Sequence, residues 1–421
     1  MTLDDRPETG TAAQTGGELR VPGHVARLDL TNFRSYAALR LDVGPSPVVL
    51  TGANGAGKTN LLEALSFLAP GRGLRRAALP EVARVHAGSA ATAWAVAARV
   101  EGPDGVVALG TGMEANVGGG PARRAVRVDG ESVRGQAAFA ERISMIWLAP
   151  DMDRLFMEGG SGRRRFVDRM VYGFDPEHAR RIAVYEQATR GRQKLLREGS
   201  GDSVWLAAEE ETMATTGIAI SAARREVVAR LDAAIAAEAD ARTRPFPRAG
   251  LAYEGEVETW LAEGPALEAE DRLRDTLAAG RARDADAGRA LHGPHRSDLV
   301  VHNHDKDMAA ALCSTGEQKA LLIAIVLAHA HLLGLTRGAA PVLLLDEVAA
   351  HLDQERRAAQ QADGGHAPPT PGVGQASGHE DADAGRRRRE DRVERDPRGG
   401  EPPVVLEEVV LELAGRSGEH Q

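Results

Sequence analysis

The sequence GANGAGKT at residues 52–59 decides the fold, because it fits the P-loop pattern G-x-x-x-x-G-K-[ST] at every fixed position. The apolar, β-branched run at 47–51 predicts a buried strand before it, and the run at 60–65 is rich in helix formers. Glycines let successive backbone N–H groups curl around phosphates, and the N-terminus of the following helix adds partial positive charge. The motif therefore predicts a nucleoside triphosphate site on an α/β core.

Two residues of the motif carry side-chain chemistry. Lys58 is expected to reach the β- and γ-phosphates, and the Thr59 hydroxyl is expected to ligate Mg²⁺. Only four lysines occur in the chain, so the one at this position is informative. A glycine-rich turn arising by chance is the alternative, and the flanking strand and helix disfavour it. The predicted nucleotide-binding residues of this segment are Gly52, Ala53, Asn54, Gly55, Ala56, Gly57, Lys58, Thr59 and Asn60.

The composition is that of a soluble protein with room for two or three domains. The 421 residues are 43% hydrophobic, and no uninterrupted apolar run is expected to be long enough to span a bilayer. The N-terminus is acidic and polar, so a cytoplasmic protein without membrane attachment is expected. The single cysteine, Cys313, cannot form an internal disulfide and is expected to be a small buried residue. With a net charge of −9, binding to nucleic acid would have to come from local basic clusters.

A second motif lies far downstream, where the apolar run at 342–345 ends in Asp346 and Glu347. This is the form of a Walker B strand, in which Asp346 emerges at the carboxyl edge of the sheet and holds Mg²⁺ through its water shell. Glu347 would orient and polarise the attacking water as a general base. Together with the P-loop, the motif indicates a split ATPase site with a large insertion. The predicted catalytic residues are Lys58, Asp346 and Glu347, and the predicted metal ligands are Thr59 and Asp346.

The string Cys313-Ser314-Thr315-Gly316-Glu317-Gln318-Lys319 precedes that strand and opens a predicted helix at 315–333. Taken alone, a serine at a helix start is most simply an N-cap. Its place before the Walker B strand favours another interpretation, because the string resembles the signature motif of ABC-type ATPases. In that motif the serine hydroxyl and the helix N-terminus bind the γ-phosphate held by the opposite subunit. Ser314 and Gly316 are therefore expected to contact ATP across a homodimer.

The remaining unusual strings resemble those of the RecF family, bacterial recombination-mediator ATPases related to SMC heads. The matching strings are Asn32-Phe33-Arg34-Ser35-Tyr36, Pro150-Asp151, Gly159 to Asp168, Gly293 to Leu299 and Ala350 to Asp353. The fourth looks like the family's G-P-H-R-D-D-L, with Ser297 in place of an acid. The fifth resembles the D-loop after Walker B and adds Asp353 to the expected nucleotide contacts. The likeness runs from about Val25 to Arg357.

The resemblance implies an ATP switch that acts on DNA, with ATP and Mg²⁺ as cofactors. Two heads would dimerise when ATP is sandwiched between P-loop and signature, close on DNA, and reopen on hydrolysis, with weak DNA-dependent ATPase activity. Members of the family act at gapped DNA, where single strand meets duplex, and cooperate with RecO and RecR to help RecA load. They also bear on replication restart and the SOS response.

The expected fold class is α/β: an ABC-type P-loop ATPase head, with a mixed β lobe and a RecA-like parallel-sheet core, and a helical insertion subdomain. Its heptad-like repeat covers two or three heptads, which favours a short hairpin or bundle over a very long coiled coil. The predicted divisions are a disordered leader at 1–23, the first part of the head at 24–160, a helical lid or arm at 161–289, the second part of the head at 290–357 and a low-complexity tail at 358–421.

Two compact arginine clusters are candidates for DNA contacts. They comprise Arg72, Arg75 and Arg76 after the P-loop helix, and Arg163 to Arg165 in the central family string. The alternative, which the sequence favours equally, is a solvated face or pairing with nearby acids.

The tail departs from the family. A complete head needs another strand soon after the D-loop, and the sequence from Ala358 to Gly400 has no strand-like apolar run. The one later candidate, Val404 to Leu413, is far from the D-loop. A reading-frame shift near 358–361 is one hypothesis, which predicts impaired ATP hydrolysis. A genuine disordered extension that binds nucleic acid through Arg386 to Arg389 is the other.

Two other functions share part of the motif set. The nucleotide-binding subunit of an ABC-type transporter has P-loop, signature and Walker B, but the helical insertion, the arginine clusters and the RecF-like strings disfavour it. A small-molecule kinase would have a P-loop but no role for the signature string.

Overall fold

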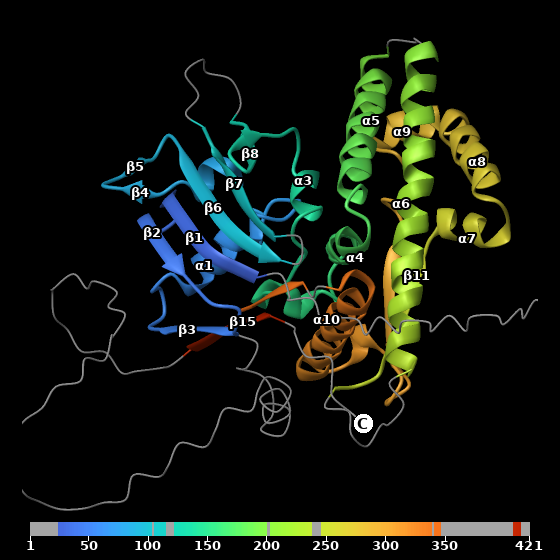
Figure 1. Ribbon diagram of the computed structural model, residues 1–421. Coiled ribbons are helices and arrows are strands. Elements are labelled where there is room, and N and C mark those ends of the chain that lie inside the picture. Colours follow the sequence, from blue (N-terminus) through green and yellow to red (C-terminus); the bar gives the residue numbers. More distant parts are fainter. Residues whose placement is uncertain are drawn as a thin grey trace, which may run out of the picture.

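The computed structural model shows a β-rich head from which a helical subdomain projects (Figure 1). The predicted leader and most of the predicted tail lie outside the residues that it describes. The described residues are 24–102, 105–114, 122–199, 203–237, 246–338, 341–346 and, for the backbone alone, 407–413.

One side of the head is an antiparallel sheet of six strands in the order β2-β1-β6-β7-β8-β9. Buried and exposed residues alternate along β6, the pattern of a sheet with one packed face. On that face the rings of Phe33, Phe67 and Trp94 meet edge to face, with centroids 5.2, 5.6 and 5.9 Å apart. Because Phe67 directly follows α1 (Lys58–Ser66), this contact fixes the P-loop helix to the sheet. The strands are β1 (His24–Phe33), β2 (Tyr36–Asp42), β6 (Trp94–Gly102), β7 (Gly105–Met113), β8 (Arg124–Val128) and β9 (Glu131–Ser132).

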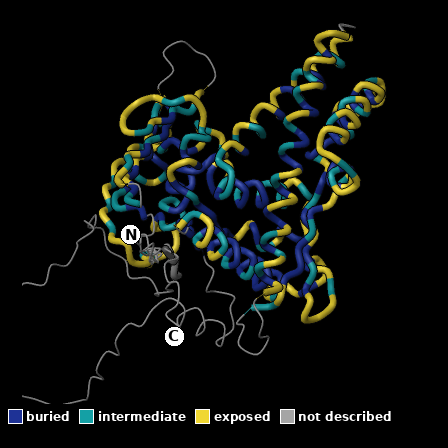
Figure 2. Tube along the Cα trace, turned by 45° about the vertical axis from the view of Figure 1, so that its right-hand side comes forward, coloured by how far each residue is buried: buried dark blue, intermediate teal, exposed yellow. Residues whose placement is uncertain are grey.

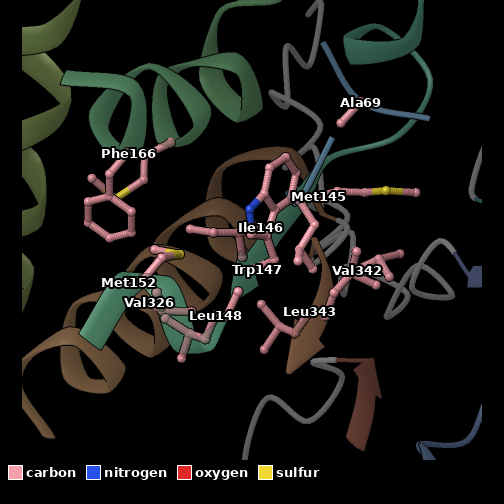
Figure 3. Close-up of a cluster of buried hydrophobic side chains, with 14 of the residues drawn as sticks. Ala69, Met145, Ile146, Trp147, Leu148, Met152, Phe166, Val326, Val342 and Leu343 are labelled. Carbon is pink, nitrogen blue, oxygen red and sulfur yellow. The ribbon is translucent and has the colours of Figure 1, made fainter. Parts of the chain in front are cut away.

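A second sheet of four strands, in the order β10-β14-β15-β3, carries the phosphate-binding motif. β10 and β14 run parallel, and every residue of both is buried. Figure 3 shows their side chains packed with Met152 and Phe166 from neighbouring helices. Such continuous apolar strands are typical of a sheet covered on both faces. The strands are β3 (Val48–Gly52), β10 (Met145–Leu148), β14 (Val342–Leu345) and β15 (Glu407–Leu413).

β15 corrects two expectations about this core. The sequence predicts no strand to close the sheet after the D-loop, and it predicts a parallel sheet. In the structure the later candidate run supplies the strand: β15 lies between β14 and β3 and pairs with both. It is antiparallel to both. The core sheet is therefore closed but mixed.

The helical subdomain is built around α5 and α6, which lie side by side (Figure 1). α6 has 35 residues, a length of roughly 50 Å at 1.5 Å per residue. Its repeating residues Met213, Ile220 and Val227 are all buried. In Figure 2 buried residues follow the inner sides of the long helices and exposed residues the outer sides. The helices are α4 (Gly160–Phe174), α5 (His178–Glu198), α6 (Ser203–Ala237), α7 (Glu256–Glu263), α8 (Ala266–Ala279) and α9 (Arg281–Ala287).

The other elements connect these two parts. A three-stranded sheet, β11-β12-β13, packs against α4 and α6. Its strands are β11 (Ala249–Glu254), β12 (Asp298–Asn303) and β13 (Met308–Ala309). The remaining segments are the helices α2 (Leu79–Val82), α3 (Ala137–Ala140) and α10 (Thr315–Arg337), the strands β4 (Val85–His86) and β5 (Ser89–Ala90), and the 3₁₀ turns η1 (Pro150–Arg154) and η2 (Ala310–Leu312).

α10 is the one described helix that is long and apolar enough to cross a membrane by length and composition, although charged and histidine residues interrupt its apolar run. The helix is nevertheless a core element, because 61% of its most apolar window is buried inside the protein. Leu321 and Ile325 on it are fully buried. Just before it, Cys313 is a free, buried cysteine, as predicted.

A buried ionic network holds the helical subdomain together. The Arg192 guanidinium, 1% exposed on α5, donates to Glu210 of α6 at 2.9 Å and to Asp284 of α9 at 2.6 Å. A third donor reaches the carbonyl oxygen of Leu277 at 2.7 Å. Three helices thus share one cation. Its removal would leave the buried Asp284 carboxylate without a cation, whereas Glu210 would keep its ion pair with Arg281.

We expect Arg192→Met to lower the free energy of unfolding by about 3–5 kcal/mol, the usual cost of breaking a buried pair from one side. Urea denaturation measures this loss. The control is Arg190→Met on the same helix, where an exposed pair with Glu186 is worth about 0–1 kcal/mol. Equal stability of the two variants would contradict the network.

We expect a chain ending at Pro403 to lose nucleotide binding and to melt at a lower temperature than the full chain. Without β15, both β3 and β14 lose a ladder of backbone hydrogen bonds, each worth about 0.5–1.5 kcal/mol. A chain ending at Ala414 keeps β15 and is the control. Normal melting and nucleotide binding in the shorter chain would contradict the position of β15.

Candidate nucleotide-binding site

The P-loop joins the end of β3 to the start of α1. Gly57 is the residue before the helix and has a φ of 103°, which residues with a side chain rarely adopt. A Cβ at this position would also lie 2.6 Å from the hydroxyl oxygen of Tyr36. The glycine is therefore required both by the backbone turn and by the close approach of Tyr36.

Lys58 is the first residue of α1, and its side chain folds back over the loop. Its Nζ donates to the carbonyl oxygen of Gly52 at 2.7 Å and to that of Ala53 at 3.2 Å. The ammonium group is thus held where the predicted phosphate contacts would lie.

The two predicted metal ligands meet in the structure. The Thr59 hydroxyl donates to Oδ1 of Asp346 at 3.2 Å, across 287 positions of sequence. Asp346 is 3% exposed, and its backbone N–H donates to the carbonyl oxygen of Leu148 at 2.9 Å, one residue beyond the paired strands. The parallel β10–β14 pair therefore fixes the backbone of Asp346 beside the P-loop helix.

The string at 32–36 contacts the P-loop and its helix α1, a role that the sequence alone does not indicate. Arg34 donates to both carboxylate oxygens of Glu63 on α1, at 2.9 and 2.6 Å, and Glu63 is fully buried. Asn60 donates to the Ser35 hydroxyl at 2.9 Å. The Tyr36 hydroxyl donates to the carbonyl oxygen of Gly57 at 3.2 Å. Three consecutive residues thus fix the first two turns of the P-loop helix.

The signature string begins α10 with a capping interaction. The Ser314 backbone N–H donates to Oε2 of Glu317 at 2.9 Å, and Lys306 forms an ion pair with the other oxygen. The Lys306 ammonium and the Ser314 N–H hold the pKa of Glu317 at about 2. Ser314 and Gly316 are exposed, so they can serve as a helix start and also face a second molecule.

Lys319, one turn further along α10, points toward the Walker B strand. It is 5% exposed, and its Nζ lies 3.6 Å from Oδ1 of Asp153 on η1. Lys319 and Asp346 line the same small cavity, together with Leu148 at the end of β10. The signature helix is therefore in contact with the surroundings of Asp346 in its own subunit. The predicted Glu347 and Asp353 lie outside the described residues.

The central family string and the string at 293–299 bind each other. Arg163 donates to both carboxylate oxygens of Asp298, at 2.8 and 2.5 Å, and Arg164 donates to the Ser297 carbonyl oxygen at 2.8 Å. Asp168 forms a second paired contact, with Arg224 of α6, at 2.7 and 2.9 Å. The two strings thus join the start of the arm to the second part of the head.

Asp168 is the centre of this junction. Burial alone raises its pKa, but the Arg224 charge and a hydrogen bond with His178 outweigh burial and lower the pKa to about 2. Arg224 also donates to the carbonyl oxygen of Pro294 at 2.9 Å. One buried carboxylate therefore organises α4, α5, α6 and the loop before β12.

The arginines predicted to contact DNA differ in whether they have a partner within the protein. Arg75 donates to Asn60 at 2.9 Å and to Glu63 at 3.3 Å, and Arg163 is paired with Asp298. These two residues form the intramolecular pairs of the alternative, and their contacts with DNA stay a prediction. Arg72 and Arg76 are exposed, and Arg165 is partly buried.

Comparison with known proteins places these features in a family. The family model described as RecF/RecN/SMC N terminal domain matches residues 24–362. The DNA replication and repair protein RecF of Mesorhizobium japonicum is 52% identical over 336 residues, covering 80% of this chain and 87% of the relative. RecF of Brucella suis biovar 1 is 50% identical over 336 residues, covering 80% and 85%.

Solved structures agree on the fold. A RecF structure described as RecF-ATPrS in the RecFOR pathway superposes with a TM-score of 0.69 at 20% identity, covering 82% of this chain and 91% of that one. A second, described as RecF-ATP, gives a TM-score of 0.67 at 20% identity, covering 80% and 88%. The predicted ABC-type ATPase head with a helical insertion is confirmed, and the alternative of a transporter subunit is not favoured. The chain belongs to the RecF family of DNA replication and repair proteins.

Proposed function

We propose that the protein is an ATP-dependent DNA-binding protein of recombinational repair and replication restart, which works in the cytoplasm as a dimer clamp. The observation that carries this proposal is the 3.2 Å contact between Thr59 and Asp346. It joins the P-loop to the Walker B strand in one polar site at the carboxyl end of the buried strand β14. RecF relatives described as DNA replication and repair proteins support the cellular role.

The residues at this site fit ATP with Mg²⁺. A threonine hydroxyl and a carboxylate oxygen are the hard oxygen ligands that Mg²⁺ prefers, and it keeps several waters alongside one or two such groups. Thr59 and Asp346 would hold the ion, which when bound would neutralise charge on the β- and γ-phosphates. Lys58 would exchange its carbonyl contacts for the phosphates. Glu347 would orient the attacking water as general base.

The exposed signature supports the proposed dimerisation. Ser314 and Gly316 start a 23-residue helix whose N-terminus carries partial positive charge. With their backbone exposed, they would bind the γ-phosphate held by a second copy. The Asp353 D-loop would complete that interface. The proposed clamp would close on gapped DNA, at junctions of single strand and duplex, and would cooperate with RecO and RecR in loading RecA during the SOS response.

We expect Lys58→Met to abolish dimerisation driven by ATP, because the phosphates lose their cation, and Glu347→Gln to keep dimerisation while blocking hydrolysis. Sedimentation velocity with and without ATP and gapped DNA measures the first effect, and phosphate release measures the second.

The matched control is Lys194→Met, which removes an exposed lysine on α5. It should behave as the unmodified chain does. A Glu347→Gln variant that stays monomeric with ATP and gapped DNA would refute the dimer clamp.

A further inference from the structure

Most arginines at the junction of head and arm are already paired. Arg163 is bound to Asp298, Arg224 to Asp168, and both Arg34 and Arg75 to Glu63. Three neighbours differ: within the described part of the chain, no carboxylate lies within ion-pair distance of Arg76, Arg165 or Arg169. The paired arginines therefore have a structural role, whereas these three are available to bind a ligand.

Arg165 and Arg169 are four residues apart on α4, so they lie on the same face of the helix. The Arg169 guanidinium stacks over the Trp147 ring at 4.3 Å from its centroid. Its Nε is buried without a hydrogen-bond partner, and one terminal nitrogen reaches only the Met152 sulfur at 3.5 Å. Arg169 is therefore held rigidly while its hydrogen-bonding capacity is largely unused.

Arg76 approaches this pair from the loop after α1. It is exposed and adopts a φ of 58°, a conformation that costs energy for a residue other than glycine and occurs often at binding sites. Burial lowers the pKa of Arg165, and the charge of Arg76 lowers it further, so the two guanidinium groups repel each other. Burial likewise lowers the pKa of Arg169 to about 10, and Arg165 contributes to this shift.

Among the described residues, the nearby acids form no ion pair with the three arginines. Asp168 also acts on Arg165 and Arg169, but it is committed to Arg224. Partial burial raises the pKa of Asp151, although the charges of Arg169 and Arg76 act against this. Glu158 is exposed and forms no ion pair with the three arginines. Three neighbouring cations, one exposed and two partly buried, that form no ion pair with a described carboxylate indicate an anionic ligand.

We propose that Arg76, Arg165 and Arg169 form a phosphate-binding site for the DNA backbone at the base of the helical arm. The inference rests on the proposed DNA-binding function and names the surface that performs it. A guanidinium suits this ligand, because its fixed donors match phosphate oxygens. The site is made from α4 and the loop after the P-loop helix, so one DNA segment would contact the arm and the nucleotide-binding head together (Figure 1).

The test uses the full chain with Arg76→Gln and Arg165→Gln combined, because both residues are accessible and neither holds a structural ion pair. Affinity for a fluorescent gapped duplex is measured across a salt titration with ATP present. Each lost phosphate contact reduces the slope of log K against log salt by about 0.9 on duplex. We expect a slope lower by about 1.8, with more than tenfold weaker binding at about 0.1 M salt.

Two controls separate the site from general loss of charge. Arg190→Gln and Arg180→Gln each remove an exposed arginine on α5. Both should keep the salt slope. Melting temperature and ATP affinity should stay unchanged in the double variant, and Arg165→Lys should recover part of the binding.

The outcomes distinguish the two levels of the proposal. If the unmodified chain fails to bind gapped DNA, the proposed function is wrong. If it binds and the double variant has the same affinity and slope, the assignment of this site is wrong. An equal loss in Arg190→Gln or Arg180→Gln also overturns the assignment, because the effect then comes from overall charge.

Discussion

The hydrogen bond between the Thr59 hydroxyl and the Asp346 carboxylate sets a constraint on the whole chain, because it joins residues 287 positions apart. For the two oxygens to meet, β3 and β14 must lie in one sheet with their carboxyl ends at the same edge. The structure satisfies this with β15 between them and with β10 fixing the other side of β14. The β10–β14 half of this sheet is fully buried and tolerates little shift, since close-packed interiors resist small displacements. The polar site therefore inherits its precision from an apolar core.

The long insertion between the P-loop and the Walker B strand must leave the contact between Thr59 and Asp346 in place. Its first helix, α4, is bound to the strand that re-enters the head through Arg163 and Asp298. Its longest helix, α6, is bound to α4 through Arg224 and Asp168. Both pairs are two-point contacts, which fix orientation as well as distance. The arm is thus joined to the head at its two chain crossings.

The sequence predicts the parts of the site that have fixed spacing. The P-loop, the Walker B strand and the signature helix are local patterns, so each can be identified without knowing what lies opposite. The partners of Glu63 could not be predicted in this way. Glu63 lies in a run of helix formers that does not distinguish it from other polar residues. Its burial depends on Arg34, which directly follows β1. Contacts between distant segments leave no local periodicity to detect.

The same limit applies to the direction of β15. The run near the end of the chain is apolar enough to predict a strand, but alternation does not reveal which neighbours a strand will pair with or in which sense. The arginines show the limit most clearly. Arg75 and Arg76 are adjacent in sequence and look equivalent, yet Arg75 is bound to a buried carboxylate and Arg76 lies near Arg165. Only the fold distinguishes a structural cation from an available one.

The departure at Ser297 has a physical explanation of the same kind. Ser297 is 1% exposed, and its hydroxyl donates to the carboxylate of Glu258, which is 4% exposed. An acid at position 297 would place a second carboxylate against Glu258 in a buried site, and two such groups cannot both ionise cheaply. The serine supplies a donor where an acid would repel, while Arg163 still finds its acid in Asp298. In this chain the buried carboxylate beside position 297 comes from α7, so the contact between the two strings survives the substitution.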